Sequence, residues 1–147
     1  YRMFLDAIVY EACLLKSDLH HIHLHCGGKD FDDIHQISQE LYEELESEID
    51  ELSEIAIAEG CNVDNFSNVK SYIGDWEPEI GEVYDFDALI SVIDDKARRY
   101  LQDLSTLSLR DPINRKYIND IKYFWNKQIN YKNTARQIPT NVKINMM

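Results

Sequence analysis

The chain has 147 residues, with 44% hydrophobic and 29% charged residues, which indicates one soluble globular domain large enough to bury a core. Its formal net charge of −12 disfavours nucleic acid as the main partner and favours the attraction of cations. We expect no membrane span, because no apolar stretch approaches the roughly 20 residues that one requires, and we find no signal-peptide pattern.

The charge is distributed unevenly along the chain. Residues 110–147 contain eight Lys and Arg but two Asp, a balance of +6, so residues 1–109 carry the remaining −18. The acidic majority disfavours DNA as a partner because it repels phosphate. The basic last quarter could still contact phosphate, or it could neutralise acidic neighbours in an assembly.

Three cysteines stand at unrelated spacings, namely Cys13, Cys26 and Cys61. An odd number without a recurring pattern argues against a disulfide framework and indicates a reducing, cytoplasmic compartment. We therefore expect each cysteine to be a small buried or half-buried thiol, with a metal-ligand role for Cys26, beside His25, as the alternative.

Apolar residues recur at intervals of three and four in the first sixty residues, which predicts two amphipathic helices. The first ends at Gly27-Gly28, because glycine commonly follows a helix C-terminus. The second is expected from about Asp32 to Glu59 and is closed by Gly60. The positions expected to be apolar are Leu5, Ile8, Ala12, Leu15, Leu19 and Ile22 in the first helix and Ile34, Ile37, Leu41, Leu45, Ile49, Leu52 and Ile55 in the second.

A long connection follows the second helix. Gly74, Pro78 and Gly81 interrupt residues 61–85, within which Asn68–Tyr72 could form a short extra helix. A connection of this length could carry the chain from one end of a helix bundle to the other.

Two further helices complete the predicted fold. The third is expected over Phe86–Leu107, and the fourth runs from Asp111-Pro112, as N-cap and first helical residue, to about Arg136. Residues 137–147 are expected to form a C-terminal tail. The elements together predict an all-α four-helix bundle that forms a single domain over residues 1–147. The expected apolar positions are Leu89, Ile93, Ala97, Tyr100, Leu104 and Leu107 in the third helix and Ile113, Tyr117, Ile121, Phe124, Trp125 and Ile129 in the fourth.

Four polar residues form the candidate metal site: His23, His35, Asp50 and Glu54. A turn of a few residues folds the chain back between the two histidines, so both imidazoles can reach one neighbourhood. The two carboxylates are four residues apart on the second helix and therefore project from one face. Imidazole and carboxylate without thiolate suit iron better than a structural zinc ion.

The spacing along the second helix decides how such a site could close. Asp50 follows His35 by fifteen residues, which is about 22 Å at 1.5 Å per residue. One subunit therefore cannot bring all four ligands to one metal ion. If the four belong together, a second copy must supply one pair, with the two helices antiparallel across a two-fold axis.

A simpler interpretation of these residues is available. Asp50 and Glu54 belong to an acid-rich stretch, residues 40–54, that could be a solvated face. His21 and His25 share another face of the first helix and could be solvated residues or an adventitious metal pair. His20 lies on the same side as His23 and could support it.

The stretch Leu19–Gly60 resembles the Dps family, the DNA-binding proteins from starved cells, which are also called mini-ferritins. It is similar to the family's first-to-second helix signature without a gap. The matching residues are His20, His23, Gly28, Phe31, His35, Tyr42, Asp50, Glu54 and Gly60. The rest of the chain matches in helix order and length.

The resemblance implies a ferritin-like subunit with the extra helix in its long connection, assembled into a hollow dodecamer. It implies that ferrous iron is bound at inter-subunit sites, oxidised with hydrogen peroxide and stored as ferric mineral. On this basis His23 and His35 are iron ligands from one subunit, and Asp50 and Glu54 are ligands from its two-fold mate. The same four residues are then the catalytic residues of a ferroxidase that protects against oxidative damage.

The sequence departs from the family pattern at three places. Gln39 stands where the family usually has a carboxylate, so one iron position is weakened or completed by water or Glu43. Leu24 stands where the family often has Trp, and the lysine-rich N-terminal tail of DNA-binding members is not visible. We therefore consider a ferroxidase first, with a DNA-coating cage and a metal-sequestering shell of weakened activity as alternatives.

Overall fold

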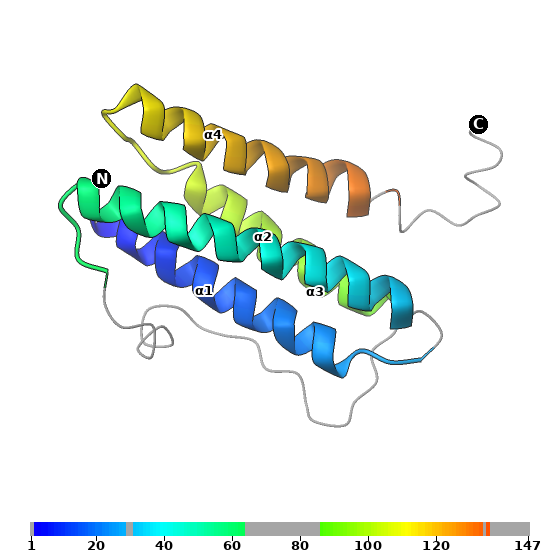
Figure 1. Ribbon diagram of the computed structural model, residues 1–147. Coiled ribbons are helices and arrows are strands. Elements are labelled where there is room, and N and C mark those ends of the chain that lie inside the picture. The colour runs from blue at the N-terminus through cyan, green and yellow to red at the C-terminus, as the bar shows by residue number, and fades with distance from the viewer. Residues whose placement is uncertain (1, 29–30, 64–85, 134, 136–147) are drawn as a thin grey trace.

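The computed structural model describes residues 2–28, 31–63, 86–133 and 135. It contains four α-helices, α1 over Arg2–His25, α2 over Phe31–Ala58, α3 over Phe86–Leu104 and α4 over Pro112–Lys127. A π-helix, η2, follows α4 over Gln128–Asn133. The prediction of an all-α four-helix bundle is therefore confirmed (Figure 1). The extra helix at 68–72 and the tail at 137–147 lie outside the described residues.

The apolar stripes predicted for the first two helices form the core of the bundle. Every predicted position of α1 and α2 is buried, and the most exposed of them, Ile49, retains 9% of its surface. At roughly 25 cal/mol per Å², this burial is the main favourable term that holds the helices together. The two helices lie side by side and antiparallel, with the end of α1 beside the start of α2 (Figure 1). None of the described helices is long and apolar enough to cross a membrane.

Local signals fix the helix ends. Gly28 and Gly60 have φ angles of 85° and 87°, a left-handed backbone that glycine adopts without steric cost. The Asp111 carboxylate accepts a hydrogen bond from the backbone N–H of Ile113 at 2.8 Å, which confirms the predicted N-cap of α4.

Three predictions about the second half of the chain were wrong in detail. The third helix ends at Leu104, because the backbone N–H groups of Thr106 and Leu107 bond to carbonyls three residues back and tighten the chain into a turn. Ile113, one of the expected apolar positions of α4, is 77% exposed.

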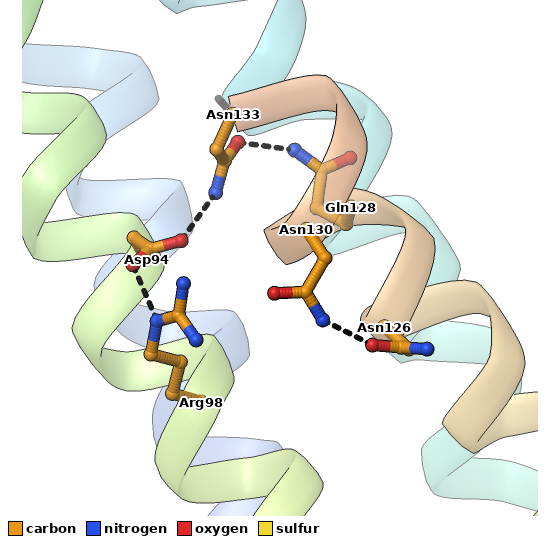
Figure 2. Close-up of polar contacts among 6 residues, drawn as sticks. All are labelled: Asp94, Arg98, Asn126, Gln128, Asn130 and Asn133. Atoms are coloured by element: carbon orange, nitrogen blue, oxygen red, sulfur yellow. Dashed lines mark hydrogen bonds and ion pairs between the residues drawn. The ribbon is translucent and has the colours of Figure 1, made fainter. Parts of the chain in front are cut away.

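The fourth helix was predicted to run to about Arg136, but the chain forms the π-helix η2 over Gln128–Asn133. The amide of Gln128 donates to the Asn133 side chain at 2.7 Å, and Asn133 donates to Asp94 of α3 at 3.2 Å (Figure 2). Asp94 also accepts from Arg98 at 2.7 Å. The wider turn of the π-helix aligns Gln128 with Asn133, five residues later, and both residues are buried. Their side-chain amides therefore hydrogen-bond to each other, and Asn133 joins η2 to α3.

A buried carboxyl group joins three helices, and the sequence analysis did not identify it. Glu48 of α2 is 1% exposed and accepts hydrogen bonds from Trp125 Nε1 of α4, at 2.9 and 3.1 Å, and from the Tyr100 hydroxyl of α3, at 3.0 Å. Burial raises the pKa of Glu48 to about 9 because the interior disfavours the charged form. Glu48 is therefore a neutral hydrogen-bond acceptor at neutral pH, and it fixes which face of α2 turns outward.

We expect the stability of the fold to fall as the pH rises, and Glu48→Gln to reduce that fall. The folded chain holds the Glu48 proton up to about pH 9, whereas the unfolded chain releases it near 4.5. The contribution of protonated Glu48 to the free energy of unfolding is therefore complete below the lower pKa, and it is lost as the pH rises through the higher pKa. Urea unfolding at several pH values between about 5 and 9 measures the difference.

Glu51→Gln is the matched control, because Glu51 is an exposed glutamate on the same helix. Its pH profile should follow that of the unaltered chain. A Glu48→Gln profile parallel to both would show that Glu48 is already ionised in the folded protein.

Candidate metal site

The structure brings His23 and His35 together, as predicted. The two imidazole rings are stacked, with centroids 3.7 Å apart and an angle of 21° between their planes. His23 belongs to the last turn of α1 and His35 to the second turn of α2, and both side chains are half-buried. The close packing of α1 against α2 and the short turn between them create this pair.

Reciprocal hydrogen bonds fix the orientation of both rings. His23 Nδ1 lies 2.9 Å from the carbonyl oxygen of His35, and His35 Nδ1 lies 3.0 Å from the carbonyl oxygen of His23. A carbonyl oxygen can only accept, so each Nδ1 carries the proton and donates it. In the neutral rings both Nε2 atoms then hold a free lone pair, which is the arrangement that metal-ligating histidines typically have.

Aromatic side chains frame the histidine pair. Phe31 stacks on His35 at a centroid distance of 4.9 Å, and the rings of Tyr42 and His23 meet in a T-shaped arrangement at 5.3 Å. His20 lies beside Tyr42 at 4.9 Å and 6.2 Å from His23, so it supports the cluster as expected. These contacts restrict ring rotation and hold both imidazoles in place.

Cys26 contacts the histidine pair as a thiol that donates a hydrogen bond. Its sulfur donates to the carbonyl oxygen of His23 at 3.6 Å, and burial raises the pKa of the thiol. All three cysteines are half-buried and none forms a disulfide, in agreement with the expectation of small half-buried thiols.

The two carboxylates lie away from the histidines in the chain. Asp50 and Glu54 are exposed on the outer surface of α2, in the half of the helix nearer its C-terminus. Within the described part of the chain, no group of three or more His, Cys, Asp and Glu side chains is placed to hold a metal ion. His35 and Asp50 belong to one continuous helix, in which fifteen residues correspond to about 22 Å.

The structure shows the environment of Gln39 and Leu24, the two residues at which the sequence departs from the family pattern. The Gln39 amide donates to Glu43 at 2.9 Å, so the carboxylate suggested as its substitute is bound to it instead. Leu24 is 62% exposed and extends away from the core. His21 and His25 stack at 4.1 Å on a separate face of α1, where His25 Nδ1 donates to the His21 carbonyl at 3.0 Å.

We expect both site imidazoles to carry the proton on Nδ1 near pH 8 in the absence of metal. Nitrogen chemical shifts of histidine-labelled protein distinguish this tautomer from the Nε2–H form, and His23→Ala and His35→Ala assign the signals. Zinc, as a redox-inert probe, should shift the unprotonated Nε2 resonances. Nε2–H rings at both positions would contradict the hydrogen-bond assignment.

Comparisons with known proteins agree with this architecture. No family model matches the sequence, and no curated protein matches it significantly. Two solved structures are similar: Dps from Listeria monocytogenes, with 18% identity, a TM-score of 0.73 and coverage of 91% of this chain and 90% of that one, and Dps from Staphylococcus aureus, with 19% identity, a TM-score of 0.69 and coverage of 93% and 94%. At these identities the likeness establishes the fold, and the chain is an all-α bundle with the fold of the Dps proteins.

Proposed function

We propose that this chain belongs to the Dps family and is a mini-ferritin that binds ferrous iron between two subunits and oxidises it. The observation that carries the proposal is the His23–His35 pair, whose reciprocal hydrogen bonds leave both Nε2 atoms available to a metal. The Dps fold and the matching positions of Asp50 and Glu54 support the assignment of the other two ligands.

Two antiparallel copies of α2 would complete the site. When His35 lies beside Glu54 of a second copy, Gln39 lies beside that copy's Asp50, because the helices rise equally in opposite directions. The same contact repeated by two-fold symmetry forms a second, identical site. The alignment requires no change within either subunit, because Asp50 and Glu54 are already exposed.

The ligand set suits an iron substrate that is oxidised from the ferrous to the ferric state. Neutral imidazole nitrogen binds ferrous iron, and the carboxylates of Asp50 and Glu54 favour the ferric product because they supply hard anionic oxygen. Hydrogen peroxide would accept one electron from each of two ferrous ions and take up two protons, giving two ferric ions and two water molecules. Gln39 supplies a neutral amide where a third carboxylate would hold a second iron ion, so that position would bind iron more weakly.

Charge on the same helix would favour the delivery of iron. The α2 segment contains ten Asp and Glu residues and no Lys or Arg. Such a surface raises the local concentration of cations. In a closed dodecamer, the assembly that the family resemblance implies, this acidic surplus would also provide sites where ferric mineral can begin to form.

We expect the combined variant His23→Ala with Asp50→Ala to oxidise ferrous iron with peroxide about tenfold or more slowly than the unaltered chain, since it loses a ligand from each half of the site. Absorbance of the ferric product follows the reaction. The matched control is His21→Ala with Glu51→Ala, which removes one histidine from α1 and one carboxylate from α2, as the site variant does. Equal rates for the site variant and the unaltered chain would contradict the proposal.

A further inference from the structure

Two exposed apolar side chains lie near the opposite ends of α2. Phe31, the first residue of the helix, is 40% exposed, and Ile57, one residue before its end, is 63% exposed. The remaining large apolar residues of α2 are buried in the bundle core. Among the residues that the structure describes, Phe31 and Ile57 therefore both leave apolar surface exposed on α2.

Helix geometry places both residues on the face that carries the candidate metal site. At 100° per residue, Phe31 and Ile57 are about 80° apart around the axis. His35 falls between them at about 40°, and Asp50 lies about 20° beyond Ile57. These residues thus form one strip of α2 that spans about 140° around the axis, with Glu54 at its far edge, about 60° beyond Ile57.

This strip is complementary to itself in one antiparallel register. Aligning His35 with Glu54 of a second copy brings Phe31 level with position 58 of that copy, within one residue of its Ile57. An apolar side chain then meets an apolar side chain at both ends of the contact, while imidazole meets carboxylate between them. A shift by one helical turn would place Phe31 beside polar residues instead.

We propose that Phe31 packs against Ile57 of the partner subunit, and that this pair sets the register of the two-fold contact and covers one side of each metal site. The inference rests on the proposed function for its alignment of His35 with Glu54. Phe31 already stacks on His35 at 4.9 Å, so covering its free surface also shields that imidazole from water. The pair is a positioning device, because Phe31 acts on the metal through His35.

Cysteine cross-linking tests the register in the full chain without iron. In a background with Cys13, Cys26 and Cys61 changed to Ser, Phe31→Cys with Ile57→Cys should form covalent dimers under mild oxidation. Each single variant should not, because symmetry-related copies of either position would be roughly 40 Å apart. The two positions of one subunit are equally distant, so only contact between subunits can join them.

Pairing Phe31→Cys with Ser53→Cys is the matched control, since Ser53 lies one helical turn from Ile57 on α2. Efficient cross-linking of that control, or of a single variant, would overturn the proposed register. Absence of cross-linking in every pair, with helical content retained in circular dichroism, would overturn the interface. Because the readout needs no iron, failure of iron oxidation with cross-linking intact would refute the proposed function and leave the register standing.

A second variant tests the packing itself. Ile57→Asp should shift sedimentation toward smaller species, with the dissociation constant raised about tenfold or more, because it buries a charge beside Phe31. Ile113→Asp is the control, since Ile113 is a comparably exposed isoleucine on α4. Equal sedimentation of the two variants would show that Ile57 is not in the contact.

Discussion

The rise of an α-helix is the constraint on which the candidate site depends. His35 and Asp50 are held about 22 Å apart by fifteen residues of one uninterrupted helix, and no side chain can span that distance. The distance persists because α2 has no Pro or Gly and is anchored along its length by buried apolar residues. One subunit therefore carries two separate half-sites on this helix. The chemistry that we propose requires two subunits, each of which contributes one half-site.

Two polar arrangements fix the orientation of α2 within the subunit. The reciprocal bonds between His23 and His35 join the end of α1 to the start of α2 through the Nδ1 atoms and leave both Nε2 lone pairs available. Glu48, bound by Trp125 and Tyr100, holds the opposite face of α2 in the core. A buried acceptor satisfied from two other helices limits rotation of α2, because rotation would leave the carboxyl group without partners. The inward anchor therefore keeps Asp50 and Glu54 on the outside.

The sequence predicted the elements well where periodicity and end signals agreed, as in α1, α2 and the Asp111 cap. It failed at Gln128–Asn133, because the π-helix arises from a bond between two amides and from a partner on α3, and neither has a periodic signature. Ile113 was misjudged because an apolar residue in the first turn of a helix can lie beyond the edge of the core. The histidine pair was predicted from its turn, but the carbonyl bonds that fix its tautomer depend on tertiary packing. Glu48 was missed because its neighbours in sequence make it look like one more acid on a solvated face.

Complementation between two inactive variants tests most directly whether the site is shared between subunits. One variant carries His23→Ala with His35→Ala, and the other carries Asp50→Ala with Glu54→Ala. After dissociation and joint reassembly in equal amounts, half of the two-fold pairs are mixed, and each mixed pair has one complete site, so about a quarter of the unaltered oxidation rate should return. A mixture that stays inactive, although mass spectrometry shows mixed assemblies, would contradict the shared site.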